Sequence, residues 1–502
     1  MRRRLLTIII LFPFLSNLVL SFNIPIAKSE LNTITVPDDF PTIQEAIDNA
    51  QEGFTVYVRN GTYRELLSIN KSIELVGESN VGTIINGTTR TLPIVIMVTS
   101  AINVTIRQLA VATTPWDYGT CIGVLFSHHV RIEDNQMFTN GDGVDMEYSD
   151  ENMILRNIMV SSARIVLLHA NFNVILGNTW LNYGGEGVEI GESNNNLVCS
   201  NTFMSTSHYA VGVIVGGSRL GALSHDNIIT KNTILGPYTG VFLSYSDGTK
   251  VWHNNIQGGG DLPDAIVQNS DETSWDSGYP TGGNHWANYN GTDNYGGPYQ
   301  NETGSDGIGD TPYVFDAENA DHYPLMQTYD GGTPDIGLLF QVTKQIVSEQ
   351  YNREVVVEVN VVNSGQEPEL FNIICKMNLT IQQQAVHLSE MNATTIVFSW
   401  NLTQIPLGRY VISAEGILAN DTDLTDNYQS ASIRVVIPGD VSSRQIGIAD
   451  GIVNMRDISY IVLQFYTDPY RAKWNPNVDV NNDGTINMTD ISIAVFNFNK
   501  HE

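Results

Sequence analysis

The stretch GVDMEYSDENMILRN (Gly143–Asn157) recurs as RIVLLHANFNVILGN (Arg164–Asn178) and GVEIGESNNNLVCSN (Gly187–Asn201). GVLFSHHVRIEDN (Gly123–Asn135) and GVFLSYSDGTKVWHN (Gly240–Asn254) align with these copies. The asparagines that end the units are 21–23 residues apart, except for one step of 31: they are Asn135, Asn157, Asn178, Asn201, Asn232 and Asn254. A fixed period of this length is typical of a solenoid in which each repeat forms one turn.

Each unit contains short alternating strands separated by polar turns, and three strands in about 22 residues predict one coil of a β-helix. The pattern predicts eight inward residues: Val144, Met146, Ile165, Leu167, Val188, Ile190, Val241 and Leu243. The residues between them form an outward column of Asp145, Val166, Glu189 and Phe242. We expect the asparagines to hydrogen-bond from coil to coil as a ladder, because asparagine tolerates left-handed backbone and its amide both donates and accepts.

Before the repeats, residues 42–50 predict an amphipathic helix that covers the open end of the solenoid. The pattern PTIQEAIDNA, VYVRNGTY and SIELVGE resembles the N-terminal cap and first coils of right-handed parallel β-helix proteins of the pectin-lyase-like superfamily. Residues 34–327 as a whole are similar to the NosD-type branch, which is common in archaeal surface proteins. In that resemblance the Gly- and aromatic-rich segment Gly278–Met326 is the second cap.

Residues 333–437 change to longer strands with a period of two, separated by turn residues. This pattern predicts a β-sandwich, and NVVNSG and TTIVFSWN resemble parts of Ig-like adhesion modules. The predicted fold class is therefore mainly β, with a parallel β-helix, an Ig-like sandwich and a small helical module at residues 438–502.

The last 65 residues contain the sharpest chemical motif. A twelve-residue loop carries oxygen ligands at its expected positions and Gly484 at the sixth, where the backbone turns sharply. The predicted Ca2+ ligands are Asp479, Asn481, Asp483, Thr485, Asn487 and Asp490. Aspartate at the twelfth position and the tandem layout resemble a type I dockerin, which implies a cohesin-like protein partner.

An upstream copy of the loop keeps Asp450, Asn454 and Asp457, and Asp440 stands where the first ligand is expected. About six extra residues separate Asp440 from the rest of the motif. Two alternatives follow. Either the insertion loops out and Asp440 still reaches the ion, or this site is empty and only the fold persists.

Asp145 and Glu189 lie two coils apart in the outward column, about 9–10 Å between backbones at the usual strand spacing. That span suits the two carboxylates of an inverting glycoside hydrolase, so they are the candidate catalytic pair. The hydrolases of the resembled superfamily have a consecutive Asp pair and a Gly-His-Gly-type turn, and this sequence has neither. The alternative is a solvated acidic face.

The net charge of −29 argues against nucleic acid as a partner, since it would repel phosphates.

Residues 1–29 read as a secretion signal with three arginines and an apolar run, so we expect a secreted or cell-surface protein without membrane insertion after signal removal. An uncleaved anchor is the alternative. Eleven N-x-S/T sequons are compatible with glycosylation. The odd set Cys121, Cys199 and Cys375 predicts buried free thiols.

We therefore expect an exported protein that binds polysaccharide or glycan through the β-helix and docks to its partner through the calcium module. A polysaccharide-degrading enzyme held in a complex by that module is the second hypothesis, and a purely structural envelope protein is the third. Copper is not expected, because no His, Met and Cys cluster has soft-ligand spacing and the pair His128 and His129 stands alone.

Overall fold

The computed structural model describes residues 32–87, 94–113, 118–205, 207, 209–217, 223–236, 238–258, 263–330, 334–348, 350, 354–378, 380–402, 405–421, 423–443, 447–468 and 474–501. The predicted secretion signal lies outside the described residues. No described helix is long and apolar enough to cross a bilayer.

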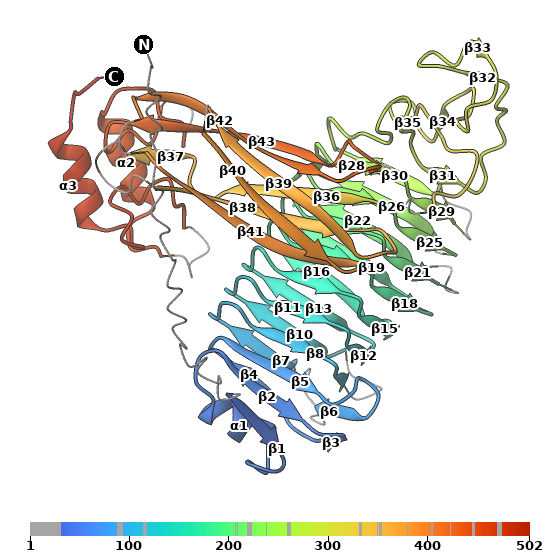
Figure 1. The fold of residues 1–502 in the computed structure, drawn as a ribbon, viewed down its shortest axis with the longest axis horizontal. Coiled ribbons are helices and arrows are strands. Elements are labelled where there is room, and N and C mark those ends of the chain that lie inside the picture. Colours follow the sequence, from blue (N-terminus) through green and yellow to red (C-terminus); the bar gives the residue numbers. More distant parts are fainter. Residues whose placement is uncertain are drawn as a thin grey trace, which may run out of the picture. The chain divides into compact units, whose positions relative to one another are not determined.

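The repeats form a parallel β-helix with three faces, each a parallel sheet that takes one strand from successive coils (Figure 1). The first sheet contains, in order, β1 (Thr33–Val36), β2 (Phe54–Val58), β5 (Ile73–Gly77), β8 (Thr105–Arg107), β11 (Arg131–Glu133), β14 (Met153–Leu155), β17 (Val174–Leu176), β20 (Leu197–Cys199), β24 (Ile228–Thr230) and β28 (Lys250–Trp252). The second contains β4 (Leu67–Ile69), β7 (Ile94–Thr99), β10 (Thr120–Leu125), β13 (Asp142–Glu147), β16 (Arg164–Leu168), β19 (Glu186–Gly191), β22 (Val211–Gly216), β26 (Thr239–Ser244) and β30 (Ala265–Gln268).

The third sheet contains β3 (Gly61–Tyr63), β6 (Thr83–Gly87), β9 (Ala110–Thr113), β12 (Gln136–Thr139), β15 (Ile158–Ser161), β18 (Thr179–Leu181), β21 (Thr202–Met204), β25 (Thr233–Leu235), β29 (Asn255–Gln257) and β31 (His285–Trp286). All eight residues predicted to point inward are fully buried. The predicted outward column is also confirmed, because Asp145 pairs with Val166 and Val166 with Glu189. Ile214 then separates Glu189 from Phe242.

The asparagine ladder is confirmed and extends to Asn284. At Asn157, for example, Oδ1 accepts from the backbone N–H of Asn135 at 3.0 Å, and Nδ2 donates to Asn178 Oδ1 at 3.0 Å. The expected reason was partly wrong, because the left-handed residue is the one before each asparagine, such as Arg156 with φ +52°. A second buried ladder, which the repeat alignment did not predict, contains Asn152, Asn173, Asn196 and Asn227.

Both ends of the β-helix core are covered. At the first end the predicted helix is confirmed as α1 (Ile43–Asn49), and Thr42 caps its N-terminus. At the other end Trp275 and Trp286 are buried in the core cluster with Tyr313 and Phe315 packed against it. Short two-stranded sheets accompany the last coils: β23 (Ser224–His225) with β27 (Ser246–Asp247), β32 (Tyr295–Gly296) with β33 (Glu302–Thr303), and β34 (Tyr313–Val314) with β35 (Ala320–Asp321).

Residues 336–436 form two further sheets that share one hydrophobic core. The three-stranded sheet contains β36 (Ile336–Val342), β38 (Glu354–Asn363) and β41 (Asn392–Asn401). The five-stranded sheet contains β37 (Ile346–Ser348), β43 (Tyr428–Val436), β42 (Gly408–Ile417), β39 (Glu369–Met377) and β40 (Thr380–Leu388). Their alternating burial agrees with the period of two in the sequence; the assignment to an Ig-like module remains a prediction.

The three-stranded sheet packs on the first face of the β-helix. In β14, β17 and β20 all three residues are buried, because their outward side chains meet Leu339, Val362 and Ala393. The Lys231 ammonium is buried beside this contact and pairs with Asp335 at 2.7 Å and with Asp426 at 3.0 Å. A buried cation paired in this way favours one docking geometry, because separation would leave charges unpaired.

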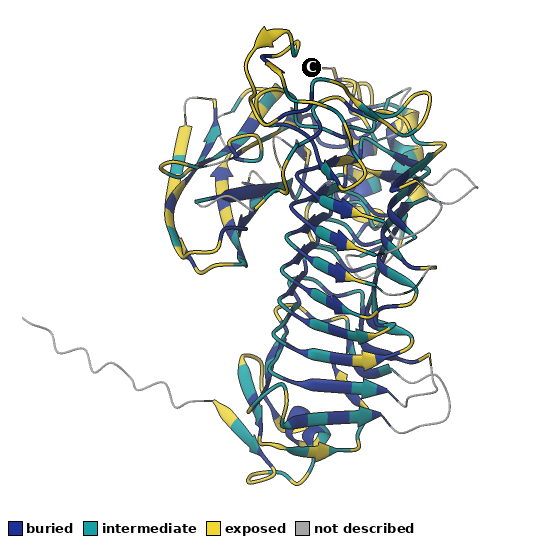
Figure 2. Ribbon diagram, turned by 90° about the vertical axis from the view of Figure 1, so that its right-hand side faces the viewer, coloured by how far each residue is buried: buried dark blue, intermediate teal, exposed yellow. Residues whose placement is uncertain are grey.

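The C-terminal residues form α2 (Met455–Leu463) and α3 (Met488–Phe496), which pack around a small core with Val453, Val478 and Ile486. Each helix begins at an asparagine cap, Asn454 or Asn487, with an aspartate completing the capping box. The helices therefore start at Met455 and Met488, before the apolar runs SYIVLQF and ISIAVF in the sequence. The inward residues of successive β-helix strands form one continuous buried core (Figure 2).

Candidate functional site

A row of rings lies just beyond the second sheet of the β-helix. Phe126, Tyr148 and His169 each follow a strand by one residue, so equivalent coil positions bring them together. The ring centroids of Phe126 and Tyr148 are 5.2 Å apart with planes 13° from parallel, and those of Tyr148 and His169 are 4.7 Å apart at 15°. All three side chains are half-buried.

Two residues further on, a parallel row of hydrogen-bonding side chains contains His128, Asp150, Asn171 and Asn194. Asn171 donates to Asp150 Oδ1 through its backbone N–H at 2.6 Å and through Nδ2 at 3.1 Å. The backbone N–H of Asn194 donates to Asn171 Oδ1 at 2.8 Å. Between the two rows, buried serines such as Ser149 hold the turn of the adjacent coil, which fixes the spacing of both rows.

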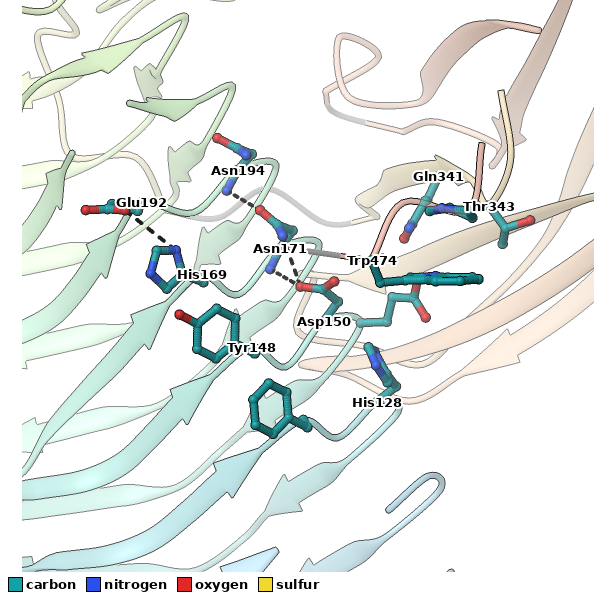
Figure 3. A pocket seen from close by; sticks show the side chains of 13 residues that line it. His128, Tyr148, Asp150, His169, Asn171, Glu192, Asn194, Gln341, Thr343 and Trp474 are labelled. Atoms are coloured by element: carbon teal, nitrogen blue, oxygen red, sulfur yellow. Dashed lines mark hydrogen bonds and ion pairs between the residues drawn. The ribbon is translucent and has the colours of Figure 1, made fainter. Parts of the chain in front are cut away.

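The two rows form one wall of a groove of about 520 Å3 (Figure 3). Gln341 and Thr343 from the three-stranded sheet region, together with Trp474 and Pro476, complete its lining. In Figure 3 the indole of Trp474 lies across the groove from the row of rings. The groove thus combines aromatic side chains with several donors and acceptors, which is the composition of a site for a polar ligand that also has apolar surface.

Three carboxyl and two imidazole side chains line the groove: Asp150, Glu151, Glu192, His128 and His169. Burial raises the pKa of Asp150, and burial lowers the pKa of His128. His169 Nδ1 lies 3.6 Å from Glu192 Oε2. Burial and then the neighbouring charges of Glu358 and Asp150 raise the pKa of Glu151 to about 8. The site therefore suits neutral or cationic groups better than anionic ones.

The candidate catalytic residues Asp145 and Glu189 lie on the outer face of the second sheet with Val166 between them. Arg164 Nη1 contacts Glu189 Oε2 at 2.7 Å, and Arg164 Nε contacts Asp142 at 2.6 Å. Burial, then the charges of Asp142 and Glu147, raise the pKa of Asp145 to about 6. The structure thus places both carboxylates on one face, and Arg164 forms an ion pair with Glu189.

The second predicted calcium loop is folded around its first and last carboxylates. Asp479 accepts the backbone N–H groups of Asp483 at 3.2 Å and Gly484 at 2.9 Å. Asp490 accepts those of Val480 at 2.8 Å and Asn487 at 2.8 Å. Gly484 has φ +81°, as the sharp turn requires. Within the described part of the chain the loop carboxylates do not gather three ligand atoms within 4.8 Å of one another.

In the first loop Asp440 occupies the position of Asp479 despite the insertion. Asp440 accepts the N–H groups of Asp450 at 3.0 Å and Gly451 at 2.7 Å. Asp457 accepts the N–H of Asn454 at 2.8 Å, as Asp490 does in the second loop. Asp440 therefore makes backbone contacts equivalent to those of Asp479, and ion binding by this loop stays a prediction.

Sequence reasoning missed the groove. Phe126, Tyr148 and His169 occupy one column of the repeat alignment, so that column was the available signal. The contributions of Gln341 and Trp474 come from distant segments, and no periodicity connects them with the repeats. Of the groove residues, the sequence pointed to three: His169 and Glu192 beside the acidic face of Asp145 and Glu189, and His128 as part of the pair with His129.

Residues 47–291 match the family model "Periplasmic copper-binding protein (NosD)". No curated protein matches the chain. Among solved structures, the mannuronan C-5 epimerase AlgE6 A-module of Azotobacter vinelandii is 14% identical over 45% of this chain and 74% of its own, with a TM-score of 0.32. An alginate lyase from Paenibacillus is 12% identical over 48% and 99%, with a TM-score of 0.29. A CARDB domain from Pyrococcus furiosus, solved with di-metal ions, is 22% identical over 20% and 89%, with a TM-score of 0.18.

Residues 47–291 are thus similar to the NosD family, and the copper in that description can be compared with this chain's residues. Cys121, Cys199 and Cys375 are buried and far apart in the fold. The cluster of potential ligands found among the described residues contains one imidazole and two carboxylates, His129, Glu151 and Glu358. These donors lack the sulfur ligands typical of a copper(I) site.

Proposed function

We propose that this protein is an exported, glycan-binding surface protein and that the groove beside the second sheet holds the glycan. The observation that carries the proposal is the stacked row of Phe126, Tyr148 and His169 facing Trp474 across a polar groove. A sugar ring has apolar C–H faces and a rim of hydroxyls. The apolar edges of the stacked rings and the Trp474 indole suit the C–H faces, and Asp150, Asn171 and their neighbours suit the hydroxyls.

The repeat supports binding of a chain rather than a single sugar. Successive coils are about 4.8 Å apart, so equivalent side chains recur along the groove at that interval. A linear glycan lying along the coils would meet the same pair of rows in each coil. The carboxyl groups of Asp150 and Glu192 favour a neutral or amino-sugar polymer over a uronic-acid polymer, because like charges repel.

A glycan array that includes neutral, amino-sugar and uronic-acid polymers tests the proposal on the full chain. We expect binding to neutral or amino-sugar glycans and at least about a tenfold loss in Tyr148→Ala, which is the loss of roughly 1.4 kcal/mol. Tyr209→Ala is the matched control, because Tyr209 is 86% exposed and does not line the groove. No glycan bound, or equal binding by both variants, would contradict the proposal.

Docking through residues 438–502 is a second proposed function, and it is favoured by a repeated apolar surface. Met455, Val462 and Leu463 of α2 are more than half exposed. Met488, Val495 and Phe496 occupy the equivalent positions of α3 and are also more than half exposed. Such residues suit a protein interface. We propose that calcium in the two loops fixes the helices and that a cohesin-like protein covers this surface.

A further inference from the structure

A separate side-chain cluster joins the β-helix to the three-stranded sheet. His129 and Glu151 occupy equivalent turn positions of adjacent coils, with φ +53° and +63°. Glu358 comes from β38, which packs from the other side. His129 Nε2 lies 3.2 Å from Glu151 Oε2 and 3.8 Å from Glu358 Oε2. All three ligand atoms lie within 4.8 Å of one another.

We propose that His129, Glu151 and Glu358 bind one Zn2+ ion. Zinc takes imidazole nitrogen and carboxylate oxygen at roughly 2.0–2.2 Å, which places tetrahedral ligand atoms about 3.3–3.5 Å apart. The two measured separations bracket that value. Three protein ligands leave a fourth position for water or another ligand.

The polar groups of the cluster are incompletely satisfied without a cation. Glu358 Oε2 is buried and has no hydrogen-bond partner among the described residues, and the same is true of Gln341 Oε1. Gln341 is paired with Glu358 across β36 and β38, and the side chains of both lie against the Glu151 carboxyl. Two carboxylates that face each other repel when both are ionised. A divalent ion neutralises both, and Gln341 orients one of them, as a neighbour of a metal ligand does.

An ion can reach this position from solvent. His129 and Glu151 line a cavity of about 180 Å3 together with Asn103 and Thr105. Glu151 also lines the groove beside the second sheet, so the cluster borders both cavities. The bound ion ties β38 to two coil turns and thereby stabilises one wall of the groove against the other. This inference does not depend on the glycan proposal, since the ligands are complete without it.

Zinc binding to the full chain tests the site, with excess Ca2+ present to fill the acidic loops. We expect equilibrium dialysis with elemental analysis to find one zinc per chain in the parent and in Glu354→Gln. Glu354 is the control because it is exposed on the same strand. His129→Ala and Glu358→Gln should each weaken zinc binding at least about tenfold. Cobalt(II) in place of zinc should give visible absorption bands that both variants lose.

Thermal unfolding distinguishes a metal site from an ion pair. Zinc should raise the unfolding midpoint of the parent and leave that of Glu358→Gln unchanged. Without zinc, Glu358→Gln should be at least as stable as the parent, because the substitution removes repulsion between carboxylates. The proposal would be overturned if the parent bound no zinc or if the variants bound it as tightly as the parent. It would also be overturned if zinc did not change the unfolding midpoint of the parent and Glu358→Gln were less stable than the parent without zinc.

Discussion

The ladder residue Asn157 offers the clearest test of the coil register. Its side chain accepts from the backbone N–H and from Nδ2 of Asn135, and donates to the Ile132 carbonyl at 2.9 Å and to Asn178 Oδ1. In Asn157→Leu the Asn135 N–H and the Ile132 carbonyl lose these partners inside the protein. A buried polar group left unsatisfied costs about 1–3 kcal/mol, so the two groups predict a loss of roughly 2–6 kcal/mol.

Chemical unfolding followed by circular dichroism measures this loss in the full chain. Asn290→Leu is the matched control, because it makes the same change at an exposed position. We expect the unfolding midpoint of Asn157→Leu to fall well below that of the parent and the midpoint of Asn290→Leu to stay near it. Equal midpoints for Asn157→Leu and the parent would refute the reasoning.

Three further predictions concern calcium, thiols and catalysis. A calorimetric titration should count two calcium ions, because Asp440 is placed as Asp479 is, and Asp479→Ala should lose one of them. Removing calcium with a chelator should lower the helix signal of α2 and α3, because ion binding fixes the loops. No bound calcium and an unchanged helix signal would end the dockerin-like proposal. Native protein should resist a thiol reagent and show three thiols once denatured, because all three cysteines are buried and burial raises the pKa of Cys121 to about 12; a disulfide would contradict the register. If the enzyme alternative holds, Asp145→Asn should lower any polysaccharide cleavage about 10²–10⁴-fold, whereas unchanged cleavage would assign Asp145 to the charged outer face.

The parts that repeat could be predicted from the sequence. A period of about 22 residues places Val144, Ile165 and Val188 on one inner face, and the asparagine column shares that period, so the coil register follows from the spacing alone. The helix at residues 43–49 was predictable from its amphipathic pattern. These features depend on local periodicity, which a single chain displays directly.

The groove as a whole could not be predicted, because four of its thirteen lining residues come from segments without a shared period. Gln341 and Trp474 reach the coil turns only through the packing of the three-stranded sheet and the C-terminal residues on the β-helix. The same packing brings Glu358 to His129, more than two hundred residues earlier in the chain. A continuous apolar run such as Met153–Leu155 was the available sign that the first face is covered on its outer side as well.

The central claim is that a glycan lies along the row of rings, and hydrogen exchange of the full chain tests it most directly. The glycan that binds best on the array is added at saturation, and protected peptides are located by mass spectrometry. The account predicts slower exchange in the turns around residues 126–128, 148–150 and 169–171 and in residues 474–477. Protection confined to the outer face around Asp145 and Glu189, with none in these turns, would contradict it.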